Sequence, residues 1–356
     1  MNSDLERLEA SAGAQFACVD DLELPARFGA WQQEWTAVRQ GCGLLDARFR
    51  RLLRVTGSDR IAFLQGMLTN DVAGVQNGQG IYAALLTIQG KIVSDLRVYA
   101  VAEELWLDVP AGRAQAVREA LERYIIADDV EFAGDEWAVL VALEGPHAVR
   151  TVTGVFGETL ETLPPFAHRA ATFGRAPIRI AAVTHSGESG YLVFGSPAVA
   201  AELWQGCRQA GAAPIGMEAL DVLRLEAGTP WYGRDMDEGM LISEIGLEAA
   251  ISYRKGCYLG QEVVERVAAR GQVHRKLIGL SGTGEHAPPP QSKLTRDTKE
   301  VGWITSAAWS PARQQIVALG YANRDCWEPG SQMQVTWAQS AMTVRVETLP
   351  FYVRPS

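Results

Sequence analysis

The feature that most restricts the fold is a change of pattern near residue 272. Before it, helical and strand-like patterns mix without the regular strand–helix–strand rhythm of a parallel sheet. After it, helical periodicity almost disappears, and five short strand-like runs follow at 276–280, 302–307, 316–321, 334–337 and 343–347. Short strands with few helices are typical of a small barrel or sandwich. We therefore predict an α+β chain with a domain boundary near residue 272.

Periodicity places the main elements of the first part. Residues 25–40 predict a helix with Trp31, Trp35 and Val38 on one face, and Ser58 predicts the N-cap of a second helix with Ile61 inward. Strands are expected at 81–88, 92–100, 104–109, 137–143, 178–183 and 191–194. Further helices are expected at 111–124, just after Pro146, at 197–210 and at 218–226.

Charge, hydropathy and cysteine usage restrict the class of protein. The 356 residues carry a net charge of −9, which argues against a general nucleic-acid coat. The longest apolar run, 137–143, is far shorter than the ~20 residues that a membrane-spanning helix needs. The acidic N-terminus does not resemble a secretion signal, and five irregularly spaced cysteines do not form a disulfide framework. We expect a cytoplasmic protein with reduced thiols that binds neither nucleic acid nor membrane.

Several common sites are excluded by their motifs. Gly90-Lys91 lacks the earlier glycine of a P-loop, no dinucleotide-binding glycine pattern follows a strand, and neither H-E-x-x-H nor C-x-x-C occurs. The five scattered histidines are interpreted as surface or core residues. Asp235, Asp237 and Glu238 are interpreted as a solvated loop, with metal binding as the alternative.

The most distinctive segment is 254–262, RKGCYLGQE. Cys257 stands beside cations and before a predicted helix, a setting that stabilises a thiolate. Residues 254–276 hold six Lys and Arg against two Glu, a net charge of +4 on an acidic chain, which suits a small anionic ligand. The alternative is a buried structural cysteine in a tight turn.

A second candidate site lies on two neighbouring strands. Asp95, Arg97 and Tyr99 share the period of two and therefore one face of the sheet, with Tyr82 on the adjacent strand. Such a polar face needs partners if it is buried, and a flat heteroaromatic ligand would supply them. The alternative is an ordinary solvent-facing strand.

Residues 255–262, KGCYLGQE, resemble the K-G-C-Y-x-G-Q-E signature of the YgfZ family, folate-binding proteins of iron–sulfur cluster maintenance. This family is related to the glycine-cleavage T-protein, an aminomethyltransferase. The resemblance extends over nearly the whole chain, through FLQG at 63–66, TNDV at 69–72, LRLEAG at 223–228, GWITS at 302–306 and Ser310-Pro311.

The resemblance implies a T-protein-like fold of three subdomains in a clover arrangement. We expect a folate-binding core at 1–272, made of interleaved subdomains near 1–135 and 136–272, and a β-barrel at 273–356. It also implies a monomer that binds tetrahydrofolate or a one-carbon derivative and acts transiently on iron–sulfur enzymes or assembly proteins, including enzymes that modify transfer RNA. The expected catalytic residues are Cys257 and Asp95, and the expected folate contacts are Tyr82, Asp95, Arg97, Tyr99, Lys255, Gly256, Tyr258 and Gln261. Lys255 would hold Cys257 as a thiolate.

Two positions depart from the T-protein pattern. Leu192 replaces a glutamate after the T-G-E-D-G-Y-like segment 186–191, and Leu220 replaces the arginine of A-R-D-x-L-R. The loss of a carboxylate and a guanidinium argues against the T-protein's way of holding folate, and T-proteins lack the Cys257 motif. Asp95 is retained, so a folate-dependent aminomethyltransferase or other one-carbon transferase is the alternative function. A third possibility is a scaffold whose Cys257 loop binds a partner protein.

Overall fold

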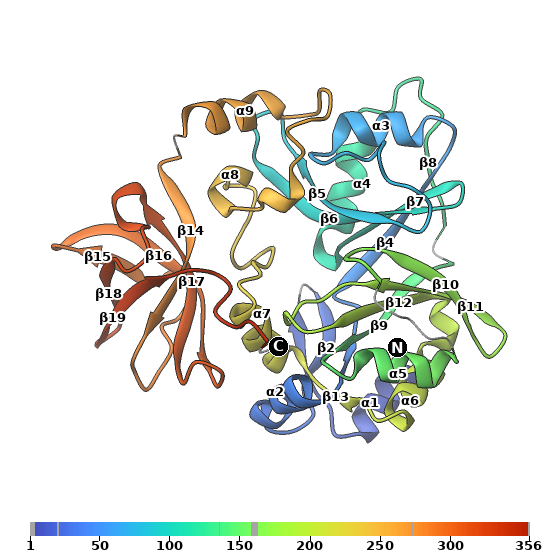
Figure 1. Ribbon diagram of the computed structural model, residues 1–356, viewed down its shortest axis with the longest axis horizontal. Coiled ribbons are helices and arrows are strands. Elements are labelled where there is room, and N and C mark those ends of the chain that lie inside the picture. Colours follow the sequence, from blue (N-terminus) through green and yellow to red (C-terminus); the bar gives the residue numbers. More distant parts are fainter. Residues whose placement is uncertain (1–3, 20, 135, 158–162, 272, 355–356) are drawn as a thin grey trace. The chain divides into compact units, whose positions relative to one another are not determined.

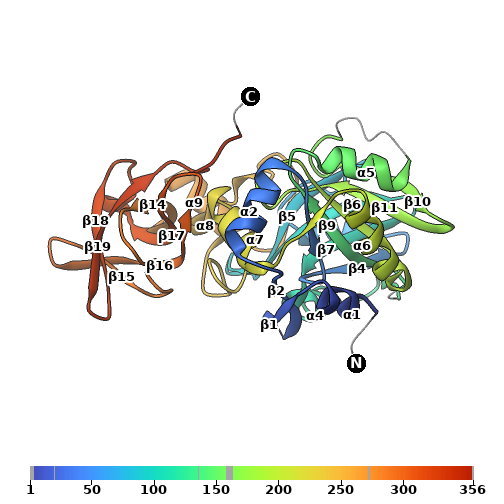
Figure 2. The ribbon, with the colours of Figure 1, turned by 90° about the horizontal axis from the view of Figure 1, so that it is seen from below.

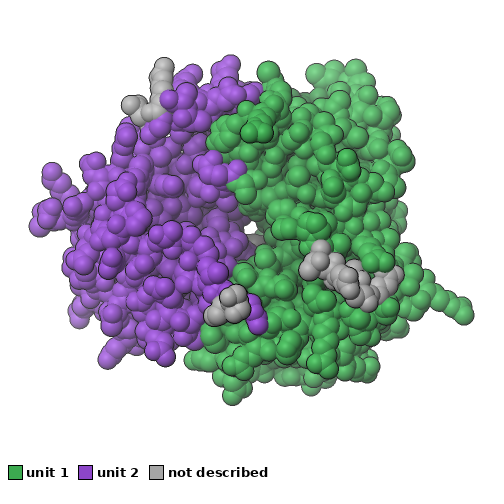
Figure 3. Space-filling model, viewed as in Figure 1, with its two compact units in different colours: residues 1–85, 93–220, 249–259 green, residues 86–92, 221–248, 260–356 purple. Residues whose placement is uncertain are grey.

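The computed structural model describes residues 4–19, 21–134, 136–157, 163–271 and 273–354. The chain divides into two compact units, shown in different colours in Figure 3. Unit 1 comprises residues 1–85, 93–220 and 249–259, and unit 2 comprises 86–92, 221–248 and 260–356. No helix among the described residues is long and apolar enough to cross a membrane.

Unit 1 contains a five-stranded sheet covered by helices on one face. Its strand order is β5 (Gly80–Leu86), β6 (Ile92–Val101), β7 (Glu104–Pro110), β4 (Arg50–Thr56) and β8 (Glu131–Phe132). Helices α3 (Arg60–Met67) and α4 (Ala114–Glu122) share a core with Leu96 and Val98 of β6. Because neighbouring side chains of a strand point to opposite faces, Asp95, Arg97 and Tyr99 project away from these helices.

The second sheet of unit 1 has six strands, drawn mainly in green in Figure 1. Its order is β10 (His168–Phe173), β11 (Ala176–Ala182), β12 (Gly190–Gly195), β9 (Ala138–Glu144), β3 (Gly43–Asp46) and β13 (Ala213–Pro214). Helices α1 (Asp4–Ser11), α5 (Ala148–Phe156) and α6 (Ala200–Gln209) bury one face, together with Tyr191 and Val193. Phe194 projects from the other face and packs against Tyr99 and Trp106, so the two sheets face each other.

The remaining elements of unit 1 are a hairpin and short helices. They are β1 (Gln15–Val19), β2 (Leu22–Arg27), α2 (Trp31–Gln40), and the 3₁₀ helices Ala111–Arg113, Pro197–Val199 and, from unit 2 into unit 1, Glu248–Ala250. Helix α7 (Met217–Glu226) likewise runs from unit 1 into unit 2.

Unit 2 contains a closed antiparallel barrel, seen from below in Figure 2. Its strand order is β14 (Arg275–Gly282), β17 (Gln315–Asn323), β16 (Lys299–Ser310), β15 (Lys293–Arg296), β18 (Gln332–Trp337) and β19 (Ser340–Glu347). Inward residues such as Leu280, Ile304 and Val335 form its core. Helices α8 (Ile242–Ile245) and α9 (Gln261–Arg270) and the 3₁₀ helix Arg324–Cys326 complete the unit.

The α+β class and the C-terminal antiparallel barrel are confirmed, whereas several local predictions are wrong. The helix predicted from residue 25 begins at Trp31, because 22–27 pair with β1 as β2. The N-cap of α3 is Asp59 instead of Ser58, and Ile61 is exposed. Strand β10 was not predicted, because its burial depends on distant partners that no local pattern shows.

Candidate functional site

The polar face of β6 is buried in unit 1. Asp95 is 7% exposed, Arg97 8% and Tyr99 0%. The alternative of a solvent-facing strand is therefore wrong, since a second sheet covers this face. Burial of three polar side chains costs free energy unless each finds a hydrogen-bond partner, so the partners show which groups are structural and which are available to a ligand.

Tyr82 and Asp95 form a pair across β5 and β6. The hydroxyl of Tyr82 donates to Oδ2 of Asp95 over 3.0 Å. Burial raises the pKa of the Tyr82 hydroxyl, and the Asp95 charge raises it further, so Tyr82 stays protonated and remains the donor. The other carboxylate oxygen, Oδ1, is buried and has no hydrogen-bond partner among the described residues. Asp95 thus keeps one acceptor for a further group.

An aromatic ring stands beside this pair. Phe166 stacks on Tyr82 with ring centroids 6.2 Å apart and an interplanar angle of 18°. The backbone of Phe166 has φ = 64°, a left-handed conformation that is unfavourable for a bulky residue. It occurs mainly where the surrounding structure enforces it. The two stacked rings thus lie next to the Asp95 carboxylate, whose Oδ1 has no partner among the described residues.

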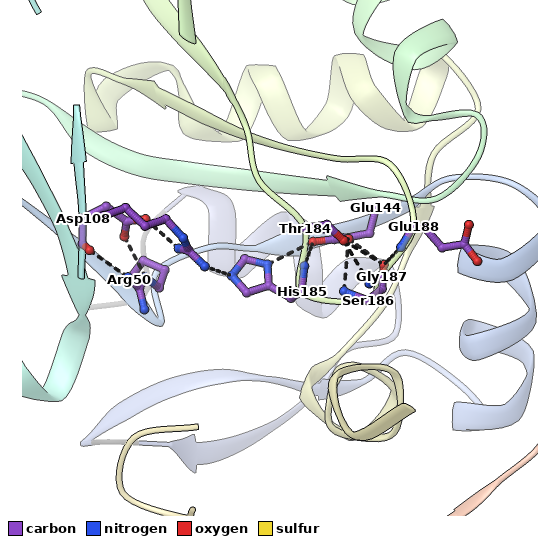
Figure 4. Close-up of polar contacts among 9 residues, drawn as sticks. Arg50, Asp108, Glu144, Thr184, His185, Ser186, Gly187 and Glu188 are labelled. Carbon is purple, nitrogen blue, oxygen red and sulfur yellow. Dashed lines mark hydrogen bonds and ion pairs between the residues drawn. The ribbon is translucent and has the colours of Figure 1, made fainter. Parts of the chain in front are cut away.

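Arg97 belongs to a buried polar chain that runs from Asp108 through His185 to Glu144. Figure 4 labels these three partners. Its Nη1 donates to Oδ2 of Asp108 over 2.7 Å, and Nε of Arg50 donates to Oδ1 of the same carboxylate over 2.7 Å. These two guanidinium groups hold the pKa of Asp108 below its usual value despite full burial. The fully buried Asp108 carboxylate therefore serves two cations at once.

His185 continues this chain from Arg97 to Glu144. Nη2 of Arg97 lies 3.2 Å from Nε2 of His185, and Nδ1 of His185 lies 2.9 Å from Oε1 of Glu144. Burial lowers the pKa of His185, so the ring is neutral. Because a guanidinium only donates, Nε2 must accept and Nδ1 must carry the proton that goes to Glu144. The Arg97 guanidinium is thus held in place from two sides.

Glu144 also anchors the loop after β11. It accepts hydrogen bonds from the hydroxyls of Thr184 and Ser186 over 2.9 and 2.6 Å, and from the backbone N–H of His185 over 2.8 Å. Figure 4 shows these groups gathered around the carboxylate. The sequence interpretation assigned no role to Glu144, Asp108 or His185, and a buried polar chain of this kind has no local sequence signal.

Tyr99 and His168 contribute two further buried groups. The Tyr99 ring lies edge-on to His168 at a centroid distance of 5.6 Å. Within the described part of the chain, neither the Tyr99 hydroxyl nor Nε2 of His168 has a hydrogen-bond partner. Burial raises the pKa of Tyr99 and lowers that of His168 to about 4, so both are neutral at pH 7. Together with Oδ1 of Asp95, they leave unsatisfied donors and acceptors, as expected at a site for a polar aromatic ligand.

The Cys257 segment is held by Lys255. Its Nζ donates to the backbone carbonyls of Gln65, Leu68 and Asn70 over 2.5, 2.7 and 2.9 Å, at the C-terminal end of α3. Burial lowers the pKa of Lys255 to about 8, so it remains largely protonated at neutral pH. An ammonium group has three donors and all three are occupied. No donor of Lys255 is left for a hydrogen bond to Cys257, because this cation caps the end of α3. That the charge of Lys255 stabilises the Cys257 thiolate stays a prediction.

Cys257 itself is exposed, so the alternative of a buried structural cysteine is also wrong. Neighbouring Gly256 is exposed with open space around it, whereas Tyr258 is buried. Helix α9 begins only at Gln261, after Gly260 at φ = 81°. Gln261 donates its side-chain amide to Glu265 over 2.6 Å, one turn further along α9. The folate contacts predicted at Gly256, Tyr258 and Gln261 stay predictions.

The segment is connected to the Tyr82–Asp95 pair through one residue of unit 1. The side-chain amide of Asn70 donates to the Tyr82 carbonyl over 2.8 Å, and the Asn70 carbonyl accepts from Lys255. Thr69, its neighbour, binds the carbonyl of Ala250 over 2.6 Å. Residues 69–70 therefore tie the exposed cysteine segment to the strand that carries Tyr82.

The acidic cluster predicted as a solvated loop is only partly one. Asp235 is buried and accepts hydrogen bonds from Arg224, Thr305 and Ser306, whereas Asp237 and Glu238 are exposed. No group of three or more His, Cys, Asp or Glu side chains that could hold a metal ion occurs among the residues described.

Comparisons with known proteins agree over nearly the whole chain. The GCVT N-terminal domain matches residues 5–255, and the glycine cleavage T-protein C-terminal barrel domain matches 275–352. Aminomethyltransferases from Nostoc sp. and Streptomyces avermitilis are each 31% identical, over 98% of this chain and 94% and 97% of theirs.

The fold is also shared with a solved structure. The glycine cleavage system aminomethyltransferase T from Bartonella henselae superimposes with a TM-score of 0.91 at 23% identity, covering 98% of this chain and 97% of that one. These comparisons support the wider superfamily of the sequence resemblance, and the narrower YgfZ assignment stays a prediction. The chain therefore belongs to the glycine cleavage T-protein (GCVT) family.

Proposed function

We propose that this protein binds tetrahydrofolate or a one-carbon derivative in unit 1 and supports iron–sulfur enzymes through Cys257. The pterin ring is flat and carries both N–H donors and acceptors. The unsatisfied Oδ1 of Asp95, the Tyr99 hydroxyl and the stacked rings of Tyr82 and Phe166 fit such a group. The resemblance of the sequence to the YgfZ and T-protein families supports the folate part of this proposal.

The observation that carries the iron–sulfur part is the support given to the exposed cysteine. Lys255 uses all three donors to fix the segment on α3, and Asn70 connects it to Tyr82. An exposed thiol on a fixed segment is accessible to a partner protein, and the KGCYLGQE motif supports this role. A single thiolate supplies one of about four ligands of a cluster, so contact with a cluster would be shared or transient.

The first experiment tests the cysteine. A deletion strain is complemented with the wild-type protein, with Cys257→Ser and with Cys18→Ser, which alters the other exposed cysteine. We expect Cys257→Ser to lose most of the rescue of iron–sulfur enzyme activity and Cys18→Ser to keep it. Full rescue by Cys257→Ser would contradict the proposed role of Cys257 in supporting iron–sulfur enzymes.

Aminomethyl transfer is the second candidate, and the names of the relatives favour it over the first. Asp95 has a free oxygen that would orient or deprotonate the amine of a donor. Against it, Leu192 and Leu220 are buried apolar residues at the positions where the resemblance expects a carboxylate and a guanidinium.

The two candidates are separated by turnover. The purified protein is incubated with tetrahydrofolate and an aminomethyl donor, and methylene-tetrahydrofolate is measured for the wild type and Asp95→Asn. Turnover that disappears in Asp95→Asn supports the transferase. Binding of folate without turnover on any donor tested supports the first candidate.

A further inference from the structure

Unit 1 contains a cavity of about 530 Å³ whose lining includes no residue of β6. It is lined by the starts of β4 and β9, by residues 197–201 and by α1. Its volume lies within the range of ligand pockets, roughly 300–1,000 Å³. Most of its wall is apolar, with Leu5, Leu22, Val139 and Leu140 among the lining residues.

The polar part of the wall consists mainly of arginines, and Arg51 is the most available. Its side chain is exposed and makes no ion pair or hydrogen bond with any residue that the structure describes. Arg50, also in the wall, donates to the carboxylate and to the backbone carbonyl of Asp108, so its guanidinium is already engaged. Arg51 is therefore the cation of this wall that is open to a ligand.

The acidic groups near the cavity already have cationic partners of their own. Asp4 in the wall pairs with Arg7, and Arg48 is occupied by Glu6 and Asp46. Glu9, close to Arg48, is fully buried, and burial raises its pKa to about 8, so it is mostly protonated at pH 7. The unpaired cation next to an apolar wall favours an anion attached to an apolar body.

We propose that this cavity is a second ligand site, which binds a small amphipathic carboxylate: its apolar body lies against Leu22, Val139 and Leu140, and its carboxylate is bound by Arg51 beside Arg50. A guanidinium matches a carboxylate through two parallel hydrogen bonds, which gives the site specificity as well as affinity. The lining includes none of Tyr82, Asp95 and Tyr99, although Arg50 in the wall shares the Asp108 carboxylate with Arg97 of β6.

Octanoate and octanol are suitable probes, because they share an apolar chain and differ in charge. Calorimetric titration of the full-length wild-type protein should give saturable binding of one octanoate per chain and weaker binding of octanol. Arg51→Gln should weaken octanoate binding about tenfold, the effect of losing one charge-assisted contact, and leave octanol binding unchanged. Arg175→Gln, which removes an exposed arginine from the β10–β11 turn, should change neither.

A second variant tests the cavity itself. Ala198 lines it and is exposed, so Ala198→Trp should fill the space and abolish binding of both probes while the melting temperature stays within a few degrees of the wild type. Asp95→Asn should leave octanoate affinity unchanged. Absence of octanoate binding at millimolar concentration, equal binding of octanol, or loss of octanoate affinity in Asp95→Asn would overturn the proposal.

Discussion

Each unit of the molecule buries a cluster of arginines and carboxylates, but the two clusters differ in how completely they are satisfied. In unit 2, Arg224 donates to Asp221, Asp235 and Ser306. The Asp235 carboxylate also accepts from Thr305 and the backbone of Trp231, and its carbonyl accepts from Tyr321. In unit 1, buried atoms of Asp95, Tyr99 and His168 lack partners among the described residues.

This difference indicates that the cluster of unit 2 has a structural role and that the cluster of unit 1 is available to a ligand. A buried polar cluster that satisfies its own atoms fixes the packing of α7 against the barrel strands and offers nothing to a ligand. A cluster that leaves buried donors and acceptors unsatisfied costs stability, which a ligand can restore. We therefore expect mutations in the first cluster to change stability and mutations in the second to change binding.

The largest effect is expected in unit 2. Asp235→Ala leaves the fully buried Arg224 charge without its main partner and should lower the free energy of unfolding by about 3–5 kcal/mol. Asp237→Ala is the matched control, because this exposed carboxylate makes one turn contact with Gly239 and should cost less than about 1 kcal/mol. Urea denaturation of the full chain measures both, and equal losses would contradict the comparison.

A pH-dependent effect is expected from His168 in unit 1. Its pKa falls from 6.5 to about 4 on folding because it is buried. The unfolded chain therefore binds more protons between these values, and stability is lost as the pH falls from 6.5 to 4, by up to about 3 kcal/mol for this group. His168→Gln should remove this part of the pH dependence, and His286→Gln, at an exposed position, should not. Parallel profiles for wild type and His168→Gln would show that the burial of His168 does not act in this way.

A smaller effect is expected at Lys255. Lys255→Met removes three hydrogen bonds to the end of α3 and should lower the free energy of unfolding by about 2 kcal/mol. Lys299→Met, at an exposed position, should have little effect. Lys255→Met should also reduce the rescue of iron–sulfur enzyme activity, because the Cys257 segment loses its anchor. A free energy of unfolding of Lys255→Met equal to that of the wild type would show that these three hydrogen bonds do not stabilise the fold.

The smallest effect on stability is expected at Asp95. Asp95→Ala removes one hydrogen bond from Tyr82 and one carboxylate that has an unsatisfied oxygen, so it should cost less than about 1 kcal/mol. Tetrahydrofolate affinity should nevertheless fall at least about tenfold. A large loss of stability with unchanged affinity would reverse the assignment of the two clusters.

The sequence alone predicted those features that depend on a local pattern of residues. Alternation along β6 placed Asp95, Arg97 and Tyr99 on one face, and the run of short strands after residue 272 predicted the barrel or sandwich. Both depend on the strand period of two and on turn residues, which a single chain displays directly.

The sequence did not predict contacts that depend on the pairing of residues far apart in the chain. His168 and His185 were interpreted as surface or core residues without a role in the site. The pairing of β10, β11 and β12 nevertheless brings them to the polar face of β6. Lys255 was assigned to its sequence neighbour Cys257, yet its partners lie at residues 65–70. In both cases the partners are distant in the sequence, and charge proximity along the chain does not reveal them.

The most direct test of the account is a crystal structure with 5-formyltetrahydrofolate bound. We predict that the pterin lies against Tyr82 and Phe166, with ring atoms within hydrogen-bond distance of Oδ1 of Asp95 and of the Tyr99 hydroxyl. A folate bound elsewhere, with these two atoms still unpartnered, would contradict the claim that the unsatisfied cluster of unit 1 is the binding site.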